Sequence, residues 1–513
     1  MLMTRGSEAL LHRQGILNPI AIKMNFLRMT VMFSINHGAV SAVLNLCVVV
    51  LGSVGSYMNG ALYVAYAATA LCGSGAIVGL LGCRGALIVG TAVYCVYVGA
   101  FPLLLVVTDP SSQIAIAIFG GAIGGVAAGF LWTAQGAYFT TSARLYAEAH
   151  DDGTVTPKQA TATFAALFGA TYLGFELILK LAPLLITIVE DMGGSGGEVN
   201  ASAAFPPPPP PPYLPGLTPP SSPSLPSEEP NGSGRYVPKT SDVVIAVLYS
   251  ICSILSSVGM TTIWDLERRQ SALTMNGDAS SGRPAPSSST SSPAPPPTPK
   301  FSIERLMSAV LLWYKRPDVL LLSPVQITFG FCAALLGLVV GHQVVPKAFP
   351  GRVATAASCL SAMVALIAAL LQYPFGKAAV LIGKPPLMLV GLSAFAGLAS
   401  LCLLLDLEQL AAIGTLVLCY VLQGVGRACY EGTNKALYAD LFPHDSEAAF
   451  SNIVLANGAA SAIGFFMFPS FTNGAIAATA FSSACVAIVA YVIAEALTRC
   501  KGTSTPPELV TIR

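Results

Sequence analysis

Long apolar stretches separated by short polar segments run through most of this chain. Between Arg28 and Arg84 there is no Asp, Glu, Lys or Arg. A helix needs about 20 mostly apolar residues to cross a bilayer, so this stretch has room for two crossings with a turn at 52–56. The pattern recurs and predicts an all-α membrane protein with about twelve transmembrane helices. The expected spans are 27–51, 57–81, 85–107, 114–134, 160–186, 243–263, 320–340, 354–371, 387–405, 410–428, 450–469 and 475–494.

Two segments of low complexity interrupt this pattern. Residues 193–240 contain an unbroken proline run at 206–212, and residues 267–300 are rich in Ser and Pro. Both compositions favour an extended, disordered chain. Because the second segment divides the spans equally, we expect two six-helix halves. The expected organisation is an N-terminal segment at 1–26, a first half at 27–263, a linker at 264–316, a second half at 317–494 and a tail at 495–513.

Lys and Arg are distributed unevenly between the two sets of loops. If the N-terminus is cytosolic, the segments on the other side hold only Arg235, Lys239, Lys347 and Arg352. Cytoplasmic loops carry the excess of Lys and Arg in membrane proteins, so both termini are expected in the cytosol. The proline-rich loop would then lie outside, where the sequons at Asn200 and Asn231 are candidates for glycosylation. The sequence does not distinguish the plasma membrane from an internal membrane.

Composition agrees with a chain whose main solvent is the lipid bilayer. Hydrophobic residues make up 54% of the 513 residues and charged residues only 10%, against about 25% charged in soluble domains. The net charge of +1 gives no indication of a basic surface that would bind nucleic acid. The twelve cysteines form no cluster with metal-ligand spacing, so neither a metal, a cofactor nor a disulfide framework is expected. We expect no enzyme, because no catalytic motif occurs, and no cleaved signal peptide, although Met24 is an alternative start.

A weak internal repeat relates the two halves. The segment GVAAGFLWTAQGAYF (125–139) aligns with GVGRACYEGTNKALY (424–438), which places Gln135 opposite Asn434. One span later, ATYLGF (170–175) aligns with ASAIGF (460–465). The repeat therefore pairs the fourth span with the tenth and the fifth with the eleventh. Two six-helix halves related by such a parallel repeat are the plan of the major facilitator superfamily.

Three segments carry a resemblance to a family within that superfamily. LWTAQGAYFTT (131–141), YEGTNKALYADLF (430–442) and NGAASAIGFFMFPSF (457–471) resemble signature segments of the Unc-ninety-three-like, ion-channel-regulatory family. The chain departs from the family at Phe175 and Glu176, and keeps only Gly82, Cys83 and Arg84 of the superfamily's motif after the second span. The resemblance implies either a transporter-like protein for an ion or small solute, or an accessory subunit or trafficking chaperone for an ion channel or receptor.

Charged residues inside the spans are the first candidates for a functional site, because such groups usually face a cavity or pair with each other. Glu176 and Lys180 are four residues apart on the fifth span, and therefore share a helix face. They form either a proton or ion site in which Glu176 titrates, or a structural pair in which Lys180 reaches toward the headgroups.

The tenth span repeats this spacing with Arg427 and Glu431. Asn434, Lys435 and Asp440 follow and extend the polar stripe. The stripe is either an inner gate or partner-docking edge, or a network of charges at the helix end. Because it coincides with the family-like segment, we expect Glu431→Gln to disturb function more than Glu176→Gln.

Four further residues and a glycine cluster complete the candidates. His37 and His342 are either proton carriers or satisfied polar groups. Trp132 and Gln135 are either ligands of a solute or anchors at the membrane interface. The glycines of the fourth span predict close helix packing rather than a phosphate loop; they are Gly120, Gly121, Gly124, Gly125 and Gly129.

Overall fold

The protein is described here by a computed structural model covering residues 18–150, 154–194, 240–266, 307–350 and 353–503. Both sequons and most of the two low-complexity segments lie outside these residues. The described residues are almost entirely helical and contain no strand. Eleven of their helical segments are long and apolar enough to cross a membrane. The fold class expected from the hydrophobic pattern is confirmed.

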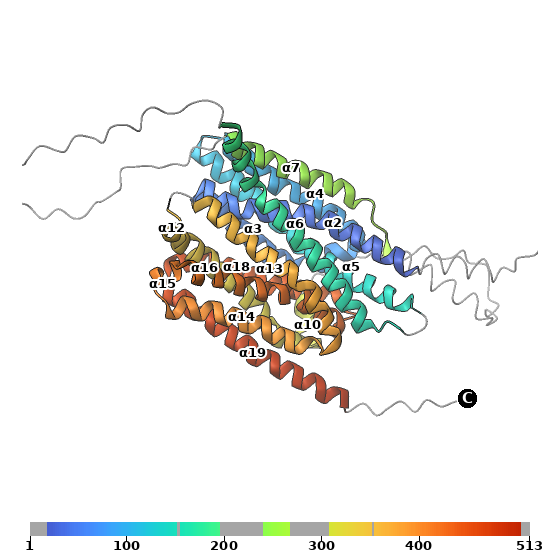
Figure 1. Ribbon diagram of the computed structural model, residues 1–513. Helices are drawn as coiled ribbons and strands as arrows, with labels where there is room; N and C mark the ends of the chain where they lie inside the picture. Colours follow the sequence, from blue (N-terminus) through green and yellow to red (C-terminus); the bar gives the residue numbers. More distant parts are fainter. Residues whose placement is uncertain (1–17, 151–153, 195–239, 267–306, 351–352, 504–513) are drawn as a thin grey trace, which may run out of the picture.

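The first half of the bundle consists of α2 to α7. In Figure 1 it forms the upper, blue-to-green layer. Its helices are α2 (Pro19–Leu51), α3 (Ser53–Cys72), α4 (Ser74–Val106), α5 (Pro110–Glu148), α6 (Pro157–Gly194) and α7 (Thr240–Met260).

The second half forms the lower, yellow-to-red layer, and the short helix α10 (Ser308–Lys315) precedes it. Several of its helices are continued by short or π-helical segments. The elements are α11 (Asp318–Leu335), η1 (Leu336–Val344), α12 (Val345–Ala348), α13 (Val353–Leu381), α14 (Lys384–Leu404), α15 (Leu407–Ala411), α16 (Ile413–Ala428), η2 (Cys429–Asn434), α17 (Lys435–Leu441), α18 (Ser446–Met467), η3 (Phe468–Ser470) and α19 (Asn473–Thr503).

The second expected span is the one that lacks the hydropathy of a membrane helix, because α3 carries Asn59 and several tyrosines. Three contacts show that it nevertheless runs the length of α18. Gly60 packs against Phe466, Gly458 against Tyr66, and the Ser74 hydroxyl lies 2.6 Å from that of Ser451. The contact with α18 continues beyond Gly73 to Ser74 at the start of α4, so the segment that packs along α18 is longer than α3 itself.

The turn between the second and third spans lies inside α4. Gly82 has φ 69° and ψ 164°, which breaks the helix at the position expected from the sequence. A positive φ of this kind is costly for a residue with a Cβ.

Glycines allow the helices of the first half to approach closely. A Cβ on Gly121 or Gly125 would lie 2.2 Å from the carbonyl oxygens of Met58 and Leu62, so α5 packs directly on the backbone of α3. The close packing expected for the fourth span is therefore present. The two halves meet along α3 and α18, and along α6 and α13, where Gly169 faces Gln372.

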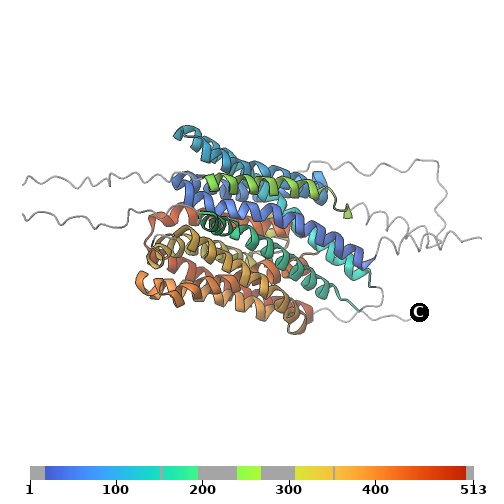
Figure 2. The ribbon, with the colours of Figure 1, turned by 45° about the horizontal axis from the view of Figure 1, so that its top comes forward.

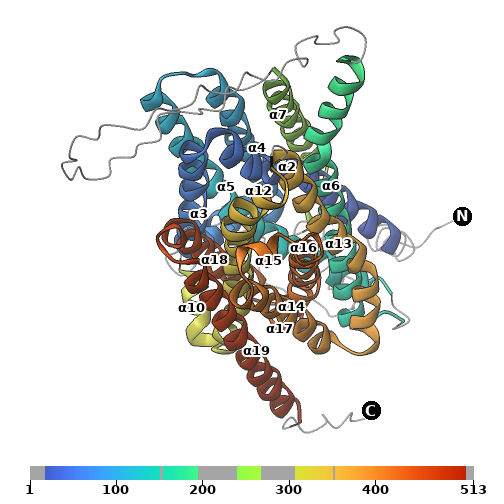
Figure 3. The same cartoon turned by 60° about the vertical axis from the view of Figure 1, so that its left-hand side comes forward.

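The helices of both halves run across the molecule in broadly the same direction (Figure 2). The start of α2 and the end of α19 lie at one end of the bundle, as two halves with even numbers of crossings require (Figure 1). Figure 3 looks at the opposite end, where α12 and α15 lie in front. Many large apolar side chains point outward, among them Leu255 (65% exposed) and Leu370 (67%). Such an apolar outer surface suits contact with lipid.

Candidate functional site

A cavity of about 1110 Å³ lies between the two halves. Residues of α2, α3, α5 and α6 line one side, and residues of α11, α13, α16 and α18 line the other. Its lining reaches Ser53 and Ser56 beside the α2–α3 turn, and His342 and Phe471 from the second half. We call this the open end of the bundle; it comes forward in Figure 3. The opposite end, where α2 begins and α19 ends, is called the closed end.

An ion-pair network crosses the cavity from one half to the other. Arg427 of α16 donates from both terminal nitrogens to the two carboxylate oxygens of Glu176 on α6, at 2.9 Å for Nη1 to Oε1. Lys180 lies one turn further along α6, with its Nζ 2.7 Å from the same carboxylate and 3.0 Å from the Ser361 hydroxyl of α13. Because Glu176 is only 1% exposed, its charge depends on these two cations for compensation.

The sequence spacing suggested one pair within each helix, and the structure differs on the tenth span. Arg427 pairs with Glu176 across the halves, so Glu431 pairs instead with Lys435, at 2.7 Å between Nζ and Oε2. Glu431 lies on the π-helical segment η2. A π-segment adds a residue to the turn and often occurs at functional sites. Here the offset presents Arg427 to the first half while Glu431 and Lys435 still line the cavity.

Lys435 also inserts into an aromatic group from the first half. Its Nζ lies 4.1 Å from the ring centroid of Trp132 on α5, and 4.6 Å and 5.9 Å from those of Phe168 and Tyr172 on α6. Cation–π contacts of a desolvated ammonium are worth about 2 kcal/mol or more. Trp132 thus packs inside the bundle, against a charge of the opposite half. We call Lys435 and these three rings the aromatic box.

His37 of α2 lies beside the aromatic box and lines the cavity. Its ring packs against Trp132 with centroids 4.9 Å apart, and against Tyr94 and Tyr172 at 5.7 Å and 5.6 Å. Its buried Nδ1 atom has no hydrogen-bond partner in the part of the chain that the structure describes. His342, by contrast, lies far along the cavity toward the open end and is exposed.

The closed end is sealed by polar contacts between the halves. Lys384 forms an ion pair with Asp440, and both bond to the hydroxyl of Thr161 on α6, at 3.1 Å from Nζ and 2.7 Å from Oδ1. We call these three residues the closed-end cluster. Between it and the cavity floor, the Phe450 ring packs on Gly136. None of the three residues of the closed-end cluster lines the cavity, whereas its lining reaches residues of the open end.

Three of the sequence candidates lie away from the cavity. Asn434 exchanges two amide hydrogen bonds of 3.1 Å with Gln326 inside the second half. Gln135 is 1% exposed, and its Oε1 has no hydrogen-bond partner among the described residues. Asp440 belongs to the closed-end cluster rather than to a stripe shared with Arg427. No group of three or more His, Cys, Asp or Glu side chains is placed to hold a metal ion in the described part of the chain.

Sequence reasoning missed several residues that the structure brings together. Phe168 and Tyr172 precede Glu176 and Lys180 at intervals of four, so one face of α6 carries all four. Extending the Glu176–Lys180 spacing backward would have found them. The sequence gives a weaker indication for Lys384, which lies just before an expected span and next to Pro385.

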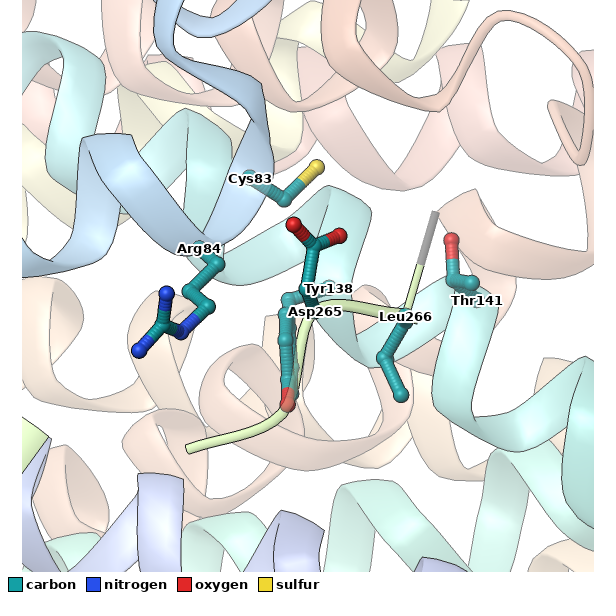
Figure 4. A pocket seen from close by; sticks show the side chains of 6 residues that line it. All are labelled: Cys83, Arg84, Tyr138, Thr141, Asp265 and Leu266. Carbon is teal, nitrogen blue, oxygen red and sulfur yellow. The ribbon is translucent and has the colours of Figure 1, made fainter. Parts of the chain in front are cut away.

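A second, much smaller cavity of about 10 Å³ lies at the closed end of the first half, and Cys83, Tyr138 and Asp265 are among the residues that line it (Figure 4). Arg84 points to one side of it and donates to the carbonyl oxygens of Ile263 and Thr261, at 2.8 Å and 2.7 Å. Arg84 therefore caps the chain that leaves α7. The space holds at most about one water molecule, so it is no solute site.

No family model and no curated protein matches the sequence, but many solved structures match the fold. One is a major facilitator superfamily proton:xylose symporter bound to 6-bromo-6-deoxy-D-glucose (12% identity, 93% of this chain and 94% of that one, TM-score 0.54). A second is a bacterial homologue of the iron transporter ferroportin in its outward-facing state (11%, 93% and 99%, 0.57). A third is the E. coli fucose:proton symporter (10%, 94% and 98%, 0.52).

The chain is thus similar to membrane transporters over nearly its whole length. It is a multi-pass membrane protein, and it has the fold of the major facilitator superfamily symporter named above. These identities are low, so the comparison establishes the fold and not a solute.

Proposed function

We propose that this protein moves a small solute across a membrane by alternating access, with its two halves rocking around the Glu176–Arg427 contact. The observation that carries the proposal is a cavity between the halves that reaches one end of the bundle while the closed-end cluster seals the other. The neighbours described as symporters for xylose and fucose support the same reading. Transporters of this superfamily bind near the midplane, between their halves.

The uneven distribution of Lys and Arg gives the proposed orientation. Lys158, Lys377 and Lys384 lie at the closed end, where α6 begins, α13 ends and α14 begins. The positive-inside rule then places the closed end in the cytosol. The cavity would open to the outside or to the lumen of an organelle, and both termini would be cytosolic.

The resemblance to the Unc-ninety-three-like family fits this site. The segment 430–442 that carries it includes Glu431, Lys435 and Asp440, which line the cavity or close its cytosolic end. The family also suggests an accessory role for an ion channel or receptor. In that case the protein would keep the fold without transporting a solute. The test below therefore measures both the relative movement of the two halves and the presence of a bound partner protein.

The test measures opening of the closed end by the distance between two spin labels. Lys158 on α6 and Val380 on α13 are exposed there and belong to different halves. Both would be replaced by Cys, after the exposed native Cys72 and Cys485, and also Cys500, are replaced by Ser. The purified, reconstituted protein should show a second, longer distance, and mass spectrometry should find no stoichiometric partner. The accessory role would replace the proposal if two results came together. The labels would give a single short distance under every ionic condition, and an equimolar channel or receptor would copurify with the protein.

A control pair monitors the open end. Ser53 at the start of α3 and Thr472 before α19 are exposed and lie on opposite halves. Alternating access requires this distance to shorten when the closed-end distance lengthens. Independent changes at the two ends would indicate general loosening of the bundle instead.

A further inference from the structure

The charged side chains that line the cavity do not balance. Lys180, Arg427 and Lys435 face Glu176 and Glu431 there, which leaves one positive charge with the histidines neutral. All five side chains are between 1% and 13% exposed. An unbalanced charge is costly so far from bulk water, and each carboxylate is already paired with at least one of the three cations. A ligand with one negative charge would complete the set.

Unpartnered polar atoms mark where such a ligand would bind. Arg427 uses its terminal nitrogens on Glu176, but its Nε is buried with no hydrogen-bond partner among the described residues. One turn earlier on α16, the Oε1 of Gln423 is in the same condition. Both side chains line the cavity, as does His37 with its unpartnered Nδ1. Buried donors and acceptors are normally satisfied, so three such atoms on side chains around one cavity indicate a polar ligand.

The rest of the wall indicates the shape of the ligand. Phe329 and Tyr430 stack with ring centroids 3.8 Å apart and planes 5° apart. Tyr63 of the first half and Phe465 of the second also line the cavity, and their rings stack with centroids 5.4 Å apart. Such walls favour a flat or bulky apolar body. A small inorganic ion would leave most of this surface uncovered.

We infer that the solute is an organic monoanion, a carboxylate with an aromatic or bulky apolar body, whose charged group binds beside Arg427 and Lys180. This inference rests on the proposed transport function and names its substrate class. The carboxylate binds the exposed parts of Lys180 and Arg427, and the body lies against the aromatic walls. An organic cation is the opposite case, and the aromatic box that would suit it is already occupied by Lys435.

The test uses carboxylates and their own amides, which differ in charge and share a body. The pairs are benzoate with benzamide, phenylacetate with phenylacetamide, and cyclohexanecarboxylate with its amide, with benzylammonium and chloride as further probes. Each is titrated against thermal unfolding of the detergent-purified full chain, because a ligand that binds only the folded state raises Tm. At least one carboxylate should bind about tenfold or more tightly than its amide. If no carboxylate exceeds its amide, or benzylammonium stabilises equally, the inference is wrong.

Two variants test whether the excess charge causes the preference. Lys180→Gln makes the lining neutral, and the carboxylate should then bind about tenfold or more weakly. Glu176→Gln combined with Lys180→Gln restores one positive charge and frees Arg427, so binding should recover. Equal carboxylate affinity in wild type and Lys180→Gln would overturn the inference. If Lys180→Gln does not fold, the carboxylate and amide affinities of the wild type and of the double variant still test the inference.

The outcome is separable from that of the proposed function. Carboxylate binding without uptake into proteoliposomes would leave the ligand class correct and remove transport. Uptake of a neutral or cationic solute without carboxylate preference would support transport and show that the inferred ligand class is wrong.

Discussion

Removing the Thr161 hydroxyl should release the closed end of the bundle. Thr161 belongs to the first half and is 6% exposed, whereas Lys384 and Asp440 both belong to the second. Opening therefore keeps the Lys384–Asp440 ion pair and breaks the two hydrogen bonds to Thr161. Thr161→Val keeps the side-chain volume and removes both bonds, so it perturbs the contact between halves and not the ion pair.

The magnitude follows from the number and kind of bonds. A hydrogen bond to a charged group contributes about 1.5–3 kcal/mol net, after exchange with water. Counting only one of the two, at the lower figure, changes the ratio of open to closed forms about tenfold. A closed end that opens in 1% of molecules would then open in about 10%.

The assay is the distance distribution between labels at positions 158 and 380, described above. The matched control is Thr163→Val. Thr163 is exposed on the same helix, and among the described residues its hydroxyl bonds only to the Gln159 carbonyl of its own turn, at 2.8 Å. The longer distance should grow for Thr161→Val and stay unchanged for Thr163→Val. Identical distributions for the two variants would refute the view that Thr161 holds the halves together.

Three further predictions concern folding and the cavity. Glu176→Gln should lower Tm more than Glu431→Gln, because it leaves two buried cations without a carboxylate at a cost of about 3–5 kcal/mol; thermal unfolding decides, and an equal loss would contradict it. Gly125→Ala should abolish folded protein at the membrane, since its Cβ would lie 2.2 Å from a carbonyl oxygen, while Gly99→Ala, with nothing within 4 Å, should behave as wild type in detergent gel filtration. Trp132→Leu should destabilise the protein by about 2 kcal/mol through the lost cation–π contact, and an unchanged Tm would show that the box contributes nothing.

The positions of the spans could be predicted because lipid imposes a length and an apolar surface on every crossing. The ends of the helices could not. The fourth span was expected to stop at 134 and the eighth at 371, but α5 continues to Glu148 and α13 to Leu381. Beyond the apolar part of each span, these helices mix polar residues with residues that pack against other helices. Hydrophobicity therefore no longer marks where a helix ends.

The candidate site was only partly predictable for a different reason. Spacing of four residues identifies neighbours on one helix, and it found Glu176 with Lys180. The Glu176–Arg427 contact joins residues 251 positions apart, so it depends on how the halves dock. The π-segment η2 also shifts the tenth span relative to an ideal helix, which a regular period does not anticipate.

The Glu176–Arg427 ion pair between the halves, with Lys180 beside it, is better explained by movement than by stability. Apolar residues in place of a buried ion pair are often neutral or stabilising by about 1–4 kcal/mol, so a static bundle gains little from Glu176, Lys180 and Arg427. Their contact differs from apolar packing because water can replace it when the halves part. The triple variant Glu176→Leu, Lys180→Met, Arg427→Met should therefore fold with a Tm at or above that of wild type, yet lose the longer closed-end distance between labels at 158 and 380. A variant that still opens as often as wild type would show that the halves part without any need for an ionic contact, and the network would then be structural.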